Sequence, residues 1–355
     1  MHRRPSLAAP VLGLLLAATL AACGSENDST EEQAAEPSTS EPSTSEPPAA
    51  EQGVFPAVVP HKFGETTVAE EPQRVVSVGV SEQDVLLQLG VTPVAVTEWY
   101  GEQPHATWPW ATDLLGDVEP EVLSTADGFE YEKVAALEPD LIIGTNAGLT
   151  KKDYALFSKI APTIPSVEGS TQYFSSWQDQ TLQISRALGR EADGQALVDE
   201  VTGAYAEVAA AHPEWAGRTA TFSQGAPYDG ELYVYPEGLS TDFLTDLGFT
   251  ITPGLQEFAP DVGSQAEISA ENVDLLEADV VVWGTETAEQ LEELLGFGTV
   301  ANLPAVAENR AVYTDDVLAG AIYFDTPLSL LYVLEHLTPM LEAAVTGEAP
   351  REFPS

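Results

Sequence analysis

Cysteine and basic side chains are both scarce in this sequence of 355 residues. The single cysteine, Cys23, excludes any disulfide within the chain. Only 13 lysines and arginines stand against 57 aspartates and glutamates, which gives a formal net charge of −44. Because so few basic side chains cannot neutralise a row of phosphates, we exclude nucleic acid as a partner.

Catalytic and metal-binding motifs are also missing from the sequence. It holds no G-x-S-x-G, no P-loop and no G-x-G-x-x-G. Acidic pairs such as Asp315 and Asp316 occur, but a chain with 57 acids forms such pairs by chance. The histidines beyond the N-terminus are scattered rather than spaced as metal ligands: His61, His105, His212 and His336. We therefore expect neither an enzyme nor a bare-metal site.

The N-terminal residues have the pattern of a secretory signal. The opening "MHRRP" is positively charged, and the apolar run "SLAAPVLGLLLAATLAA" is too short for a comfortable membrane span. We predict a signal peptide over residues 1–22. The stretch "LAAC", which ends at Cys23, resembles the bacterial lipobox, and the resemblance implies lipid attachment to Cys23 after cleavage. One acyl chain binds membranes only marginally, so several would be needed.

A low-complexity segment follows, with "EPSTS" repeated at residues 36–40 and 41–45. Residues 24–52 hold no aromatic residue, lysine or arginine, so this segment cannot bury a core. We predict that residues 23–53 are the lipidated cysteine with a disordered acidic tether.

The rest of the chain holds two similar halves. "YEKVAALEPDLIIG" (131–144) aligns with "AENVDLLEADVVVWG" (270–284), and "DVLLQLG" (84–90) aligns with "DFLTDLG" (242–248) in the same order. Each match is weak alone, but two in order indicate an internal duplication.

Alternating strand and helix patterns predict an α/β fold with mainly parallel sheets covered by helices on both faces. Apolar residues at helical spacing predict a long helix from about 193 to 211, which Pro213 ends. We predict an N-terminal lobe (54–188), a linking helix (189–213) and a C-terminal lobe (214–355), with a ligand cleft between the lobes.

Aromatic residues are frequent in the loops that should follow the strands, where open α/β sheets bind ligands. Rings with apolar faces and polar edges suit a bulky amphipathic ligand. Core packing stays open as the alternative for each ring, most of all for Tyr233 and Tyr235, which alternate along one predicted strand. The predicted cleft residues are Trp99, Tyr100, Trp108, Trp110, Tyr228, Tyr235, Trp283 and Tyr323.

The lipobox, "HKFGETTV…PQRVVSVG", the two duplicated segments and the linking helix resemble one family over residues 55–345. It comprises the substrate-binding lipoproteins of ABC importers for ferric siderophores, with cobalamin and haem binders as relatives. The resemblance implies a ligand held between two lobes joined by one helix, with the iron bound only through its chelator. It also implies that Glu132 and Glu271 dock onto the membrane permease. Stabilisation of two helix starts is the structural alternative.

The scarcity of basic residues departs from the relatives that bind anionic catecholate complexes. We therefore expect a neutral or cationic hydroxamate-type ferric complex. A haem or cobalamin receptor remains an alternative, with haem ligation by His105 or a tyrosine left open. An enzyme acting on a ferric chelate is a second alternative. The overall expectation is a monomer, lipid-anchored to the outer face of the cell membrane, with no cofactor of its own.

Overall fold

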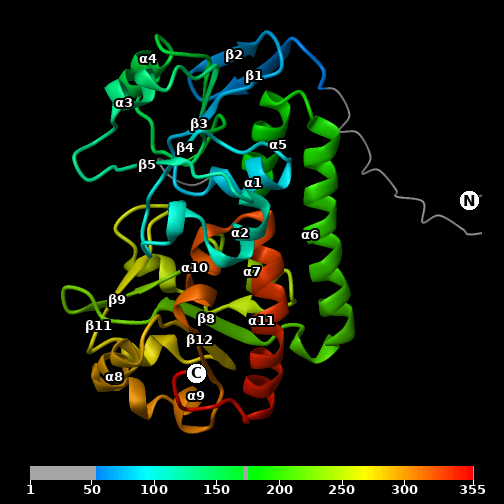
Figure 1. Ribbon diagram of the computed structural model, residues 1–355. Coiled ribbons are helices and arrows are strands. Elements are labelled where there is room, and N and C mark those ends of the chain that lie inside the picture. Colours follow the sequence, from blue (N-terminus) through cyan, green and yellow to red (C-terminus); the bar gives the residue numbers. More distant parts are fainter. Residues whose placement is uncertain (1–52, 171–174, 355) are drawn as a thin grey trace, which may run out of the picture. The chain divides into compact units, whose positions relative to one another are not determined.

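The computed structural model describes residues 53–170 and 175–354. The predicted signal sequence, Cys23 and the predicted tether up to residue 52 lie outside the described residues. The described part has two α/β lobes, and the long helix α6 (Glu191–Ala211) runs along both of them (Figure 1). The predicted fold class is confirmed. The long helix begins two residues before the predicted start near Asp193.

A parallel sheet forms the core of the N-terminal lobe, in the strand order β5-β4-β3-β6-β7. The inner strands are continuous apolar runs, because helices cover both faces of the sheet. A hairpin of β1 and β2 precedes the sheet. The strands are β1 (Ala57–His61), β2 (Gly64–Val68), β3 (Val75–Ser77), β4 (Ala95–Thr97), β5 (Glu121–Leu123), β6 (Leu141–Gly144) and β7 (Thr163–Pro165). The helices are α1 (Glu82–Gln88), α2 (Pro109–Leu115), α3 (Tyr131–Ala136), α4 (Lys151–Phe157) and α5 (Trp177–Ala187).

The C-terminal lobe has a mixed sheet in the order β11-β9-β8-β12-β13, and β10 also pairs with β8. Strand β9 runs antiparallel because the short loop 225–230 cannot make the crossover that a parallel neighbour needs. The strands are β8 (Thr219–Gln224), β9 (Glu231–Val234), β10 (Thr250–Ile251), β11 (Ala266–Ser269), β12 (Val280–Gly284) and β13 (Ala311–Tyr313). The helices are α7 (Asp242–Thr245), α8 (Ala288–Gly296), α9 (Pro304–Ala307), α10 (Asp316–Phe324) and α11 (Pro327–Thr346).

One aspartate in each lobe holds the start of the lobe's first sheet strand. Asp140 precedes β6, and its carboxylate accepts the backbone N–H groups of Gln73 and Arg74 at 2.7 and 2.8 Å. Asp279 precedes β12, and its Oδ2 accepts the backbone N–H of Thr219 at 2.8 Å. The aligned residues of the two sequence segments therefore make equivalent contacts.

The second acidic segment is not an α-helix, although the sequence pattern suggested one. Glu132 lies in the first turn of α3. Glu271 instead precedes a 3-10 helix, Val273–Leu276. The chain between β11 and β12 is only residues 270–279, which leaves no room for a longer α-helix with entry and exit turns.

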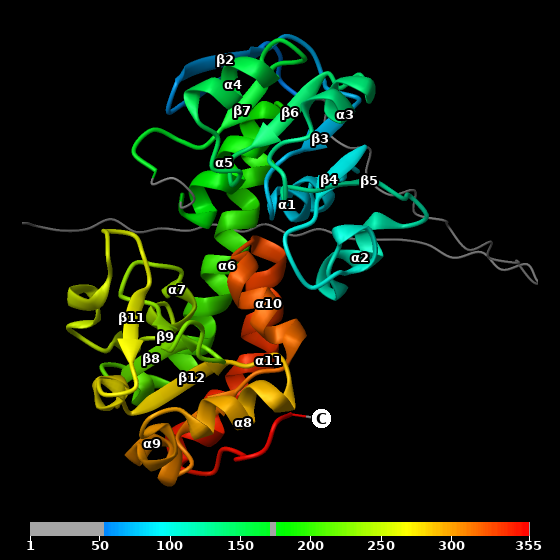
Figure 2. The same cartoon turned by 90° about the vertical axis from the view of Figure 1, so that its left-hand side faces the viewer.

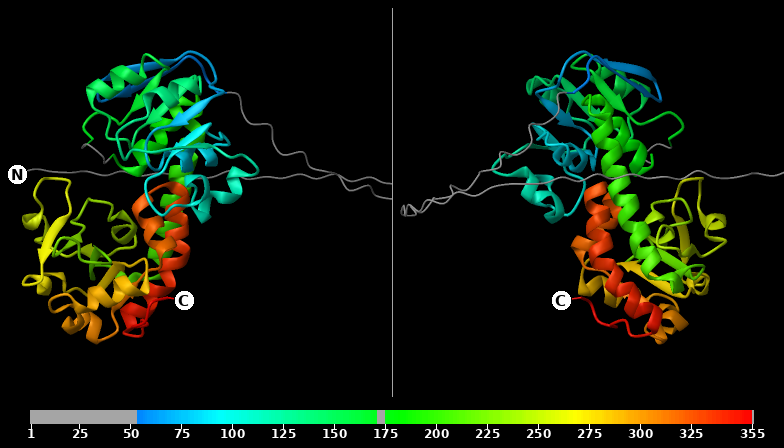
Figure 3. Two further views of the ribbon diagram at one scale, coloured as in Figure 1. Left: turned by 60° about the vertical axis from the view of Figure 1, so that its left-hand side comes forward. Right: turned by 90° about the vertical axis from the view of Figure 1, so that its right-hand side faces the viewer.

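Helix α11 is long and apolar enough to cross a membrane, as judged by length and composition within the described part of the chain. Its buried side chains recur at helical spacing, at Leu330, Val333, Leu337 and Leu341, and they belong to the core of the C-terminal lobe. Packing against that core explains the apolar character. The right panel of Figure 3 shows α11 beside α6.

The lobes also meet through a buried polar contact beside the linking helix. Asp84 in α1 is 1% exposed. Its Oδ2 accepts the indole N–H of Trp110 at 2.8 Å and the hydroxyl of Thr326, the N-cap of α11, at 2.7 Å. Burial raises the pKa of Asp84 to about 6.

Candidate functional site

Two adjacent cavities lie between the lobes. The larger has a volume of about 650 Å³, and the loops that follow β3, β4, β5 and β6 form much of its wall. The smaller has a volume of about 330 Å³, and the segments that follow β8, β9 and β12 form much of its wall. Both volumes are in the range of sites for small organic ligands.

Trp99 and Tyr323 line both cavities and mark the boundary between them. Trp99 follows β4, and Tyr323 lies in the last turn of α10, so one ring comes from each lobe. Figure 2 views the molecule from the side opposite to α6, where the two lobes face each other. The carboxyl ends of the parallel strands therefore supply the cavities, as the strand pattern predicts.

Five of the eight predicted aromatic residues line the cavities. Trp99 is 45% exposed and Tyr228 is 66% exposed, whereas Tyr235 is largely buried behind the surface of the smaller cavity. The structure places these five side chains together: Trp99, Tyr100, Tyr228, Tyr235 and Tyr323.

Trp108 and Trp110 line neither cavity and pack between the lobes instead. Their indoles stack at a centroid distance of 5.1 Å and an angle of 12°. The Trp108 ring lies against Gly320 of α10, where a Cβ would come within 2.5 Å of it. Phe324 contacts both indoles edge-on, at centroid distances of 5.7 and 5.4 Å. Trp108 is only 2% exposed, so these residues join the lobes rather than face a ligand.

Trp283 is also buried, with no exposed surface. It lies in β12, between β8 and β13 in the middle of the C-terminal sheet, and it belongs to the core cluster of that lobe. A central strand of a sheet with both faces covered has no open face for a ring. In the sequence, Trp283 lies at the end of an apolar strand. That position does not distinguish a ring in the core from a ring in a cavity.

Carboxylates are the charged groups that line the cavities. Asp153 and Asp325 line the larger cavity and Glu286 lines the smaller one, and among the described residues no lysine, arginine or histidine joins them. Burial, with the nearby charges of Asp242 and Asp246, raises the pKa of Asp325 to about 7. Burial also raises the pKa of Glu286, although a hydrogen bond from Gln290 opposes the shift.

Glu82 holds the wall of the larger cavity from behind. This residue is 1% exposed, and its Oε1 accepts the backbone N–H of Asn146 at 2.8 Å. Its Oε2 accepts the Ser77 hydroxyl at 3.3 Å. A Cβ on Gly79 would come within 1.9 Å of this carboxylate, so a larger residue there would displace the Glu82 side chain. Burial raises the pKa of Glu82. The acid positions the β6–α4 loop, which lines the cavity.

Sequence reasoning missed several polar residues of the cavities. Asn146 directly follows β6, so the rule that ligands bind beyond strand ends would have found it. Glu286 follows β12 in the same way. Gln180 and Gln290 reach the cavities from helices, and no local pattern distinguishes them from other polar helix residues.

Glu132 and Glu271 are both exposed, one in each lobe. Figure 1 shows α3, which carries Glu132, and β11, which precedes Glu271, on the side of the molecule away from α6. Neither residue lines the two interlobe cavities.

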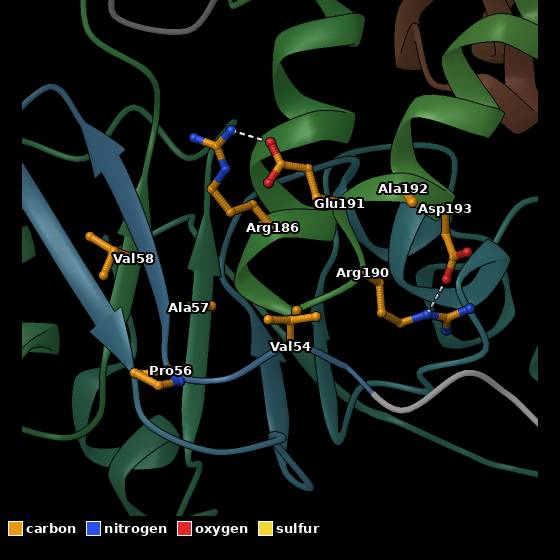
Figure 4. A pocket seen from close by; sticks show the side chains of 10 residues that line it. Val54, Pro56, Ala57, Val58, Arg186, Arg190, Glu191, Ala192 and Asp193 are labelled. Atoms are coloured by element: carbon orange, nitrogen blue, oxygen red, sulfur yellow. Dashed lines mark hydrogen bonds and ion pairs between the residues drawn. The ribbon is translucent and has the colours of Figure 1, made fainter.

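A third cavity, of about 500 Å³, lies where β1 meets the junction of α5 and α6 (Figure 4). Its two arginines are already paired, Arg186 with Glu191 and Arg190 with Asp193. It lies away from the carboxyl ends of the strands, so we do not assign it to the main ligand. Across the described residues, no group of three or more His, Cys, Asp or Glu side chains is arranged to hold a metal ion. His105 lines neither interlobe cavity.

Comparison with known proteins gives matches of sequence and of structure. The family model described as "Periplasmic binding protein" matches residues 75–318. A periplasmic solute binding protein of Mycobacterium smegmatis has a solved structure with 39% identity and a TM-score of 0.74, covering 81% of this chain and 98% of that one. PiaA of Streptococcus pneumoniae, solved in complex with ferrichrome, has 25% identity and a TM-score of 0.68, covering 82% and 99%.

Curated relatives match shorter stretches. The ferric-anguibactin-binding protein FatB of Vibrio anguillarum is 34% identical over 113 residues, which is 31% of each chain. The chain spans less than two thirds of the length of the curated relatives it matches, with values of 40%, 31% and 57%.

Proposed function

This chain belongs to the periplasmic binding protein family, and from that premise we propose that it binds a ferric siderophore between its lobes for uptake by an ABC transporter. Its family consists of substrate-binding transport proteins, so the chain is a binding protein rather than an enzyme. The observation that carries the proposal is the pair of contiguous cavities between the lobes, with aromatic walls and together large enough for a chelate. The ferrichrome complex of PiaA supports an iron chelate as the ligand class.

The charge of the cavities favours a hydroxamate complex over a catecholate complex. Ferric catecholate complexes carry several negative charges. The carboxylates Asp153, Asp325 and Glu286 line the described cavities without a basic residue, and the whole chain has a net charge of −44. An anionic complex would be repelled from this cleft, whereas a neutral or cationic one would not.

Titration of intrinsic fluorescence tests this ligand class. Trp99 lines both cavities, so we expect a bound ferric trihydroxamate to quench the tryptophan emission. Ferrichrome and ferrioxamine B serve as trihydroxamates, and ferric enterobactin serves as the catecholate. Trp99→Phe is the matched variant and should bind the same complexes with less quenching. Tight binding of the catecholate alone would contradict the preference for hydroxamates.

The linking helix limits how far the lobes can move on binding. Helix α6 joins them without a break, and Asp84, Thr326 and the stacked indoles add contacts beside it. We expect a modest closure rather than a wide rotation. Small-angle scattering of the free and loaded protein measures this change, and a large decrease in the radius of gyration on loading would contradict it.

We propose that Glu132 and Glu271 dock the loaded protein onto the permease. Each is exposed in a different lobe, and α3 and β11 both lie away from α6. Isolated exposed ion pairs contribute about 0–1 kcal/mol each, so these contacts would set register and encounter rate more than affinity. Glu132→Ala with Glu271→Ala should abolish iron uptake and leave chelate binding unchanged. Glu200→Ala with Glu207→Ala, on the exposed face of α6, is the control pair. Normal uptake by the first double variant would refute docking through these residues.

The proposed site of lipid attachment is Cys23, which lies outside the described residues. We propose that the mature chain is lipidated there and held at the outer face of the cell membrane. Cys23→Ser should release the protein into the culture medium, as fractionation with an antibody would detect. Retention of the variant in the membrane fraction would contradict lipid anchoring.

A further inference from the structure

We propose that the smaller interlobe cavity is a cation subsite, which binds an ammonium group carried by the ferric chelate, with Glu286 as its counter-ion. This inference rests on the proposed function and names the ligand more narrowly than a hydroxamate complex. The larger cavity would hold the chelate, and the smaller one would hold an arm that extends past Trp99 and Tyr323.

The walls of the smaller cavity are unusually rich in aromatic rings for a volume of about 330 Å³. Tyr323 lies next to Tyr100 and Tyr235, with centroid distances of 6.2 and 6.3 Å. Trp99 and Tyr228 complete the ring set from opposite lobes. The faces of aromatic rings attract organic cations, and several rings around one space form the arrangement that recognises ammonium groups.

Glu286 supplies the negative charge of this cavity. It is half-buried just after β12, and its backbone N–H is held by Gln290 Oε1 at 2.8 Å. No lysine or arginine pairs with Glu286 in the described residues. The charge of Asp316 adds to the negative potential at Glu286. A partly desolvated carboxylate without a counter-ion gains most from a cationic ligand.

Tyr100 offers a hydroxyl that no described group satisfies. Its Oη is buried and has no hydrogen-bond partner among the described residues, although a buried hydroxyl normally has one. Burial and the charge of Glu286 raise the pKa of Tyr100, so the phenol stays neutral and can donate a hydrogen bond. A hydrogen-bond acceptor of a ligand in the smaller cavity, which Tyr100 lines, would satisfy it.

Two chelates that differ only in this charge test the inference. Ferrioxamine B ends in an ammonium group, and its N-acetyl derivative is the same trihydroxamate without the charge. We expect wild-type protein to bind ferrioxamine B about tenfold more tightly than the acetylated form, a difference of about 1.4 kcal/mol. Glu286→Gln should remove this preference, so that the variant binds the two chelates with equal affinity. Glu289→Gln, at an exposed acid of α8, should keep the preference.

The outcomes separate this inference from the proposed function. Equal affinity of the wild-type protein for the two chelates would overturn the cation subsite and leave siderophore binding intact. An equal loss for both chelates in Glu286→Gln would also overturn it, since Glu286 would then act on the fold of the site and not on charge. Binding of neither chelate by the wild-type protein would overturn the trihydroxamate function, and the subsite with it. Binding of the acetylated chelate to Glu286→Gln shows that the variant is folded.

Discussion

The N-terminal lobe carries β4-β3-β6-β7 in the order in which the C-terminal lobe carries β10-β8-β12-β13, and all of these pairs are parallel. Asp140 holds the start of β3 in the same way as Asp279 holds the start of β8. The lobes differ at the cavity edge. The N-terminal lobe lines the cavities with Trp99, Phe129 and Asp153 among small side chains near Asn146, whereas the C-terminal lobe lines them with Tyr235, Tyr323 and Glu286.

This comparison distinguishes the residues that stabilise each lobe from the residues that would select the ligand. The contacts of Asp140 and Asp279 lie at the amino ends of the strands, away from the cavities, and repeat in both lobes, so they serve the fold. The residues that line the cavities lie at the carboxyl ends of the strands, in the loops after them and in nearby helices, and there the two lobes differ without a change in strand order. The Trp-rich loop of the N-terminal lobe supplies Trp99 to the cavities and Trp108 to the contact between lobes.

The largest expected effect on stability distinguishes aromatic residues that join the lobes from those that line the cavities. Trp108→Ala should lower the free energy of unfolding by about 3–5 kcal/mol, because it empties a fully buried site between the lobes. Tyr228→Ala, at a ring that is 66% exposed in the C-terminal lobe, should change it by less than about 0.5 kcal/mol. Urea denaturation measures both. Similar losses for the two variants would contradict the assignment.

The next effect concerns the buried carboxylate between the lobes. The native state raises the pKa of Asp84 from 3.8 to about 6, so the native protein binds this proton more tightly than the unfolded chain does. Stability from this group is therefore greatest at low pH and falls as the pH rises from about 4 to above 6, by about 3 kcal/mol in all.

Asp84→Asn should flatten this part of the pH dependence of unfolding. The difference between wild type and variant isolates Asp84 from the general repulsion among the other acids. Parallel curves for the two proteins between pH 4 and 8 would show that Asp84 is not the titrating group.

A matched pair of substitutions tests the equivalence of the two lobes. Asp140→Asn and Asp279→Asn should each lower the free energy of unfolding by about 1–2 kcal/mol, since each weakens charge-assisted bonds to a strand start. The bonds from Thr219 lower the pKa of Asp279, so its contribution is present above the unfolded pKa and is lost in acid as the pH falls through the lowered folded pKa. Thermal unfolding at pH 7 gives both losses, and an effect in only one lobe would break the comparison.

The smallest effect distinguishes the two glutamates that we propose as docking residues. Glu132→Gln should lower stability by a few tenths of a kcal/mol, about 0.3–0.5, because Glu132 lies in the first turn of α3. Glu271→Gln should have no measurable effect, since Glu271 lies outside the 3-10 helix that follows it. Chemical denaturation of both variants measures the two changes in stability. A larger loss at Glu271 would favour a structural role there.

Much of the fold was predictable because its signals are local and repeated. Apolar strand runs such as "LIIG" and "VVVWG", the glycine Gly90 just after the C-cap of α1, and the spacing of α6 each depend on neighbouring residues. The failures came where tertiary context decides. The sequence had given no direction for strand β9, which depends on a short loop, and the 3-10 helix after Glu271, where an α-helix was expected, depends on the space between two strands.

The sequence predicted the position of the candidate site better than it predicted which residues line it. The aromatic loops after the strands pointed to the cleft, and five of the eight rings line it. Trp108 and Trp283 are buried by partners that are distant in sequence, such as Gly320 for Trp108. No sequence pattern near either tryptophan indicates these partners. Gln180 and Glu82 act through contacts that exist only once the lobes have folded.

The parallel indoles of Trp108 and Trp110 have a spectroscopic consequence. Two identical chromophores 5.1 Å apart couple electronically, so their near-ultraviolet absorption and circular dichroism depend on how the two rings are arranged. Since Phe324 of the other lobe contacts both rings, this signal depends on how the lobes are seated. The near-ultraviolet signal of this indole pair can therefore report the alignment of the two lobes without any added label.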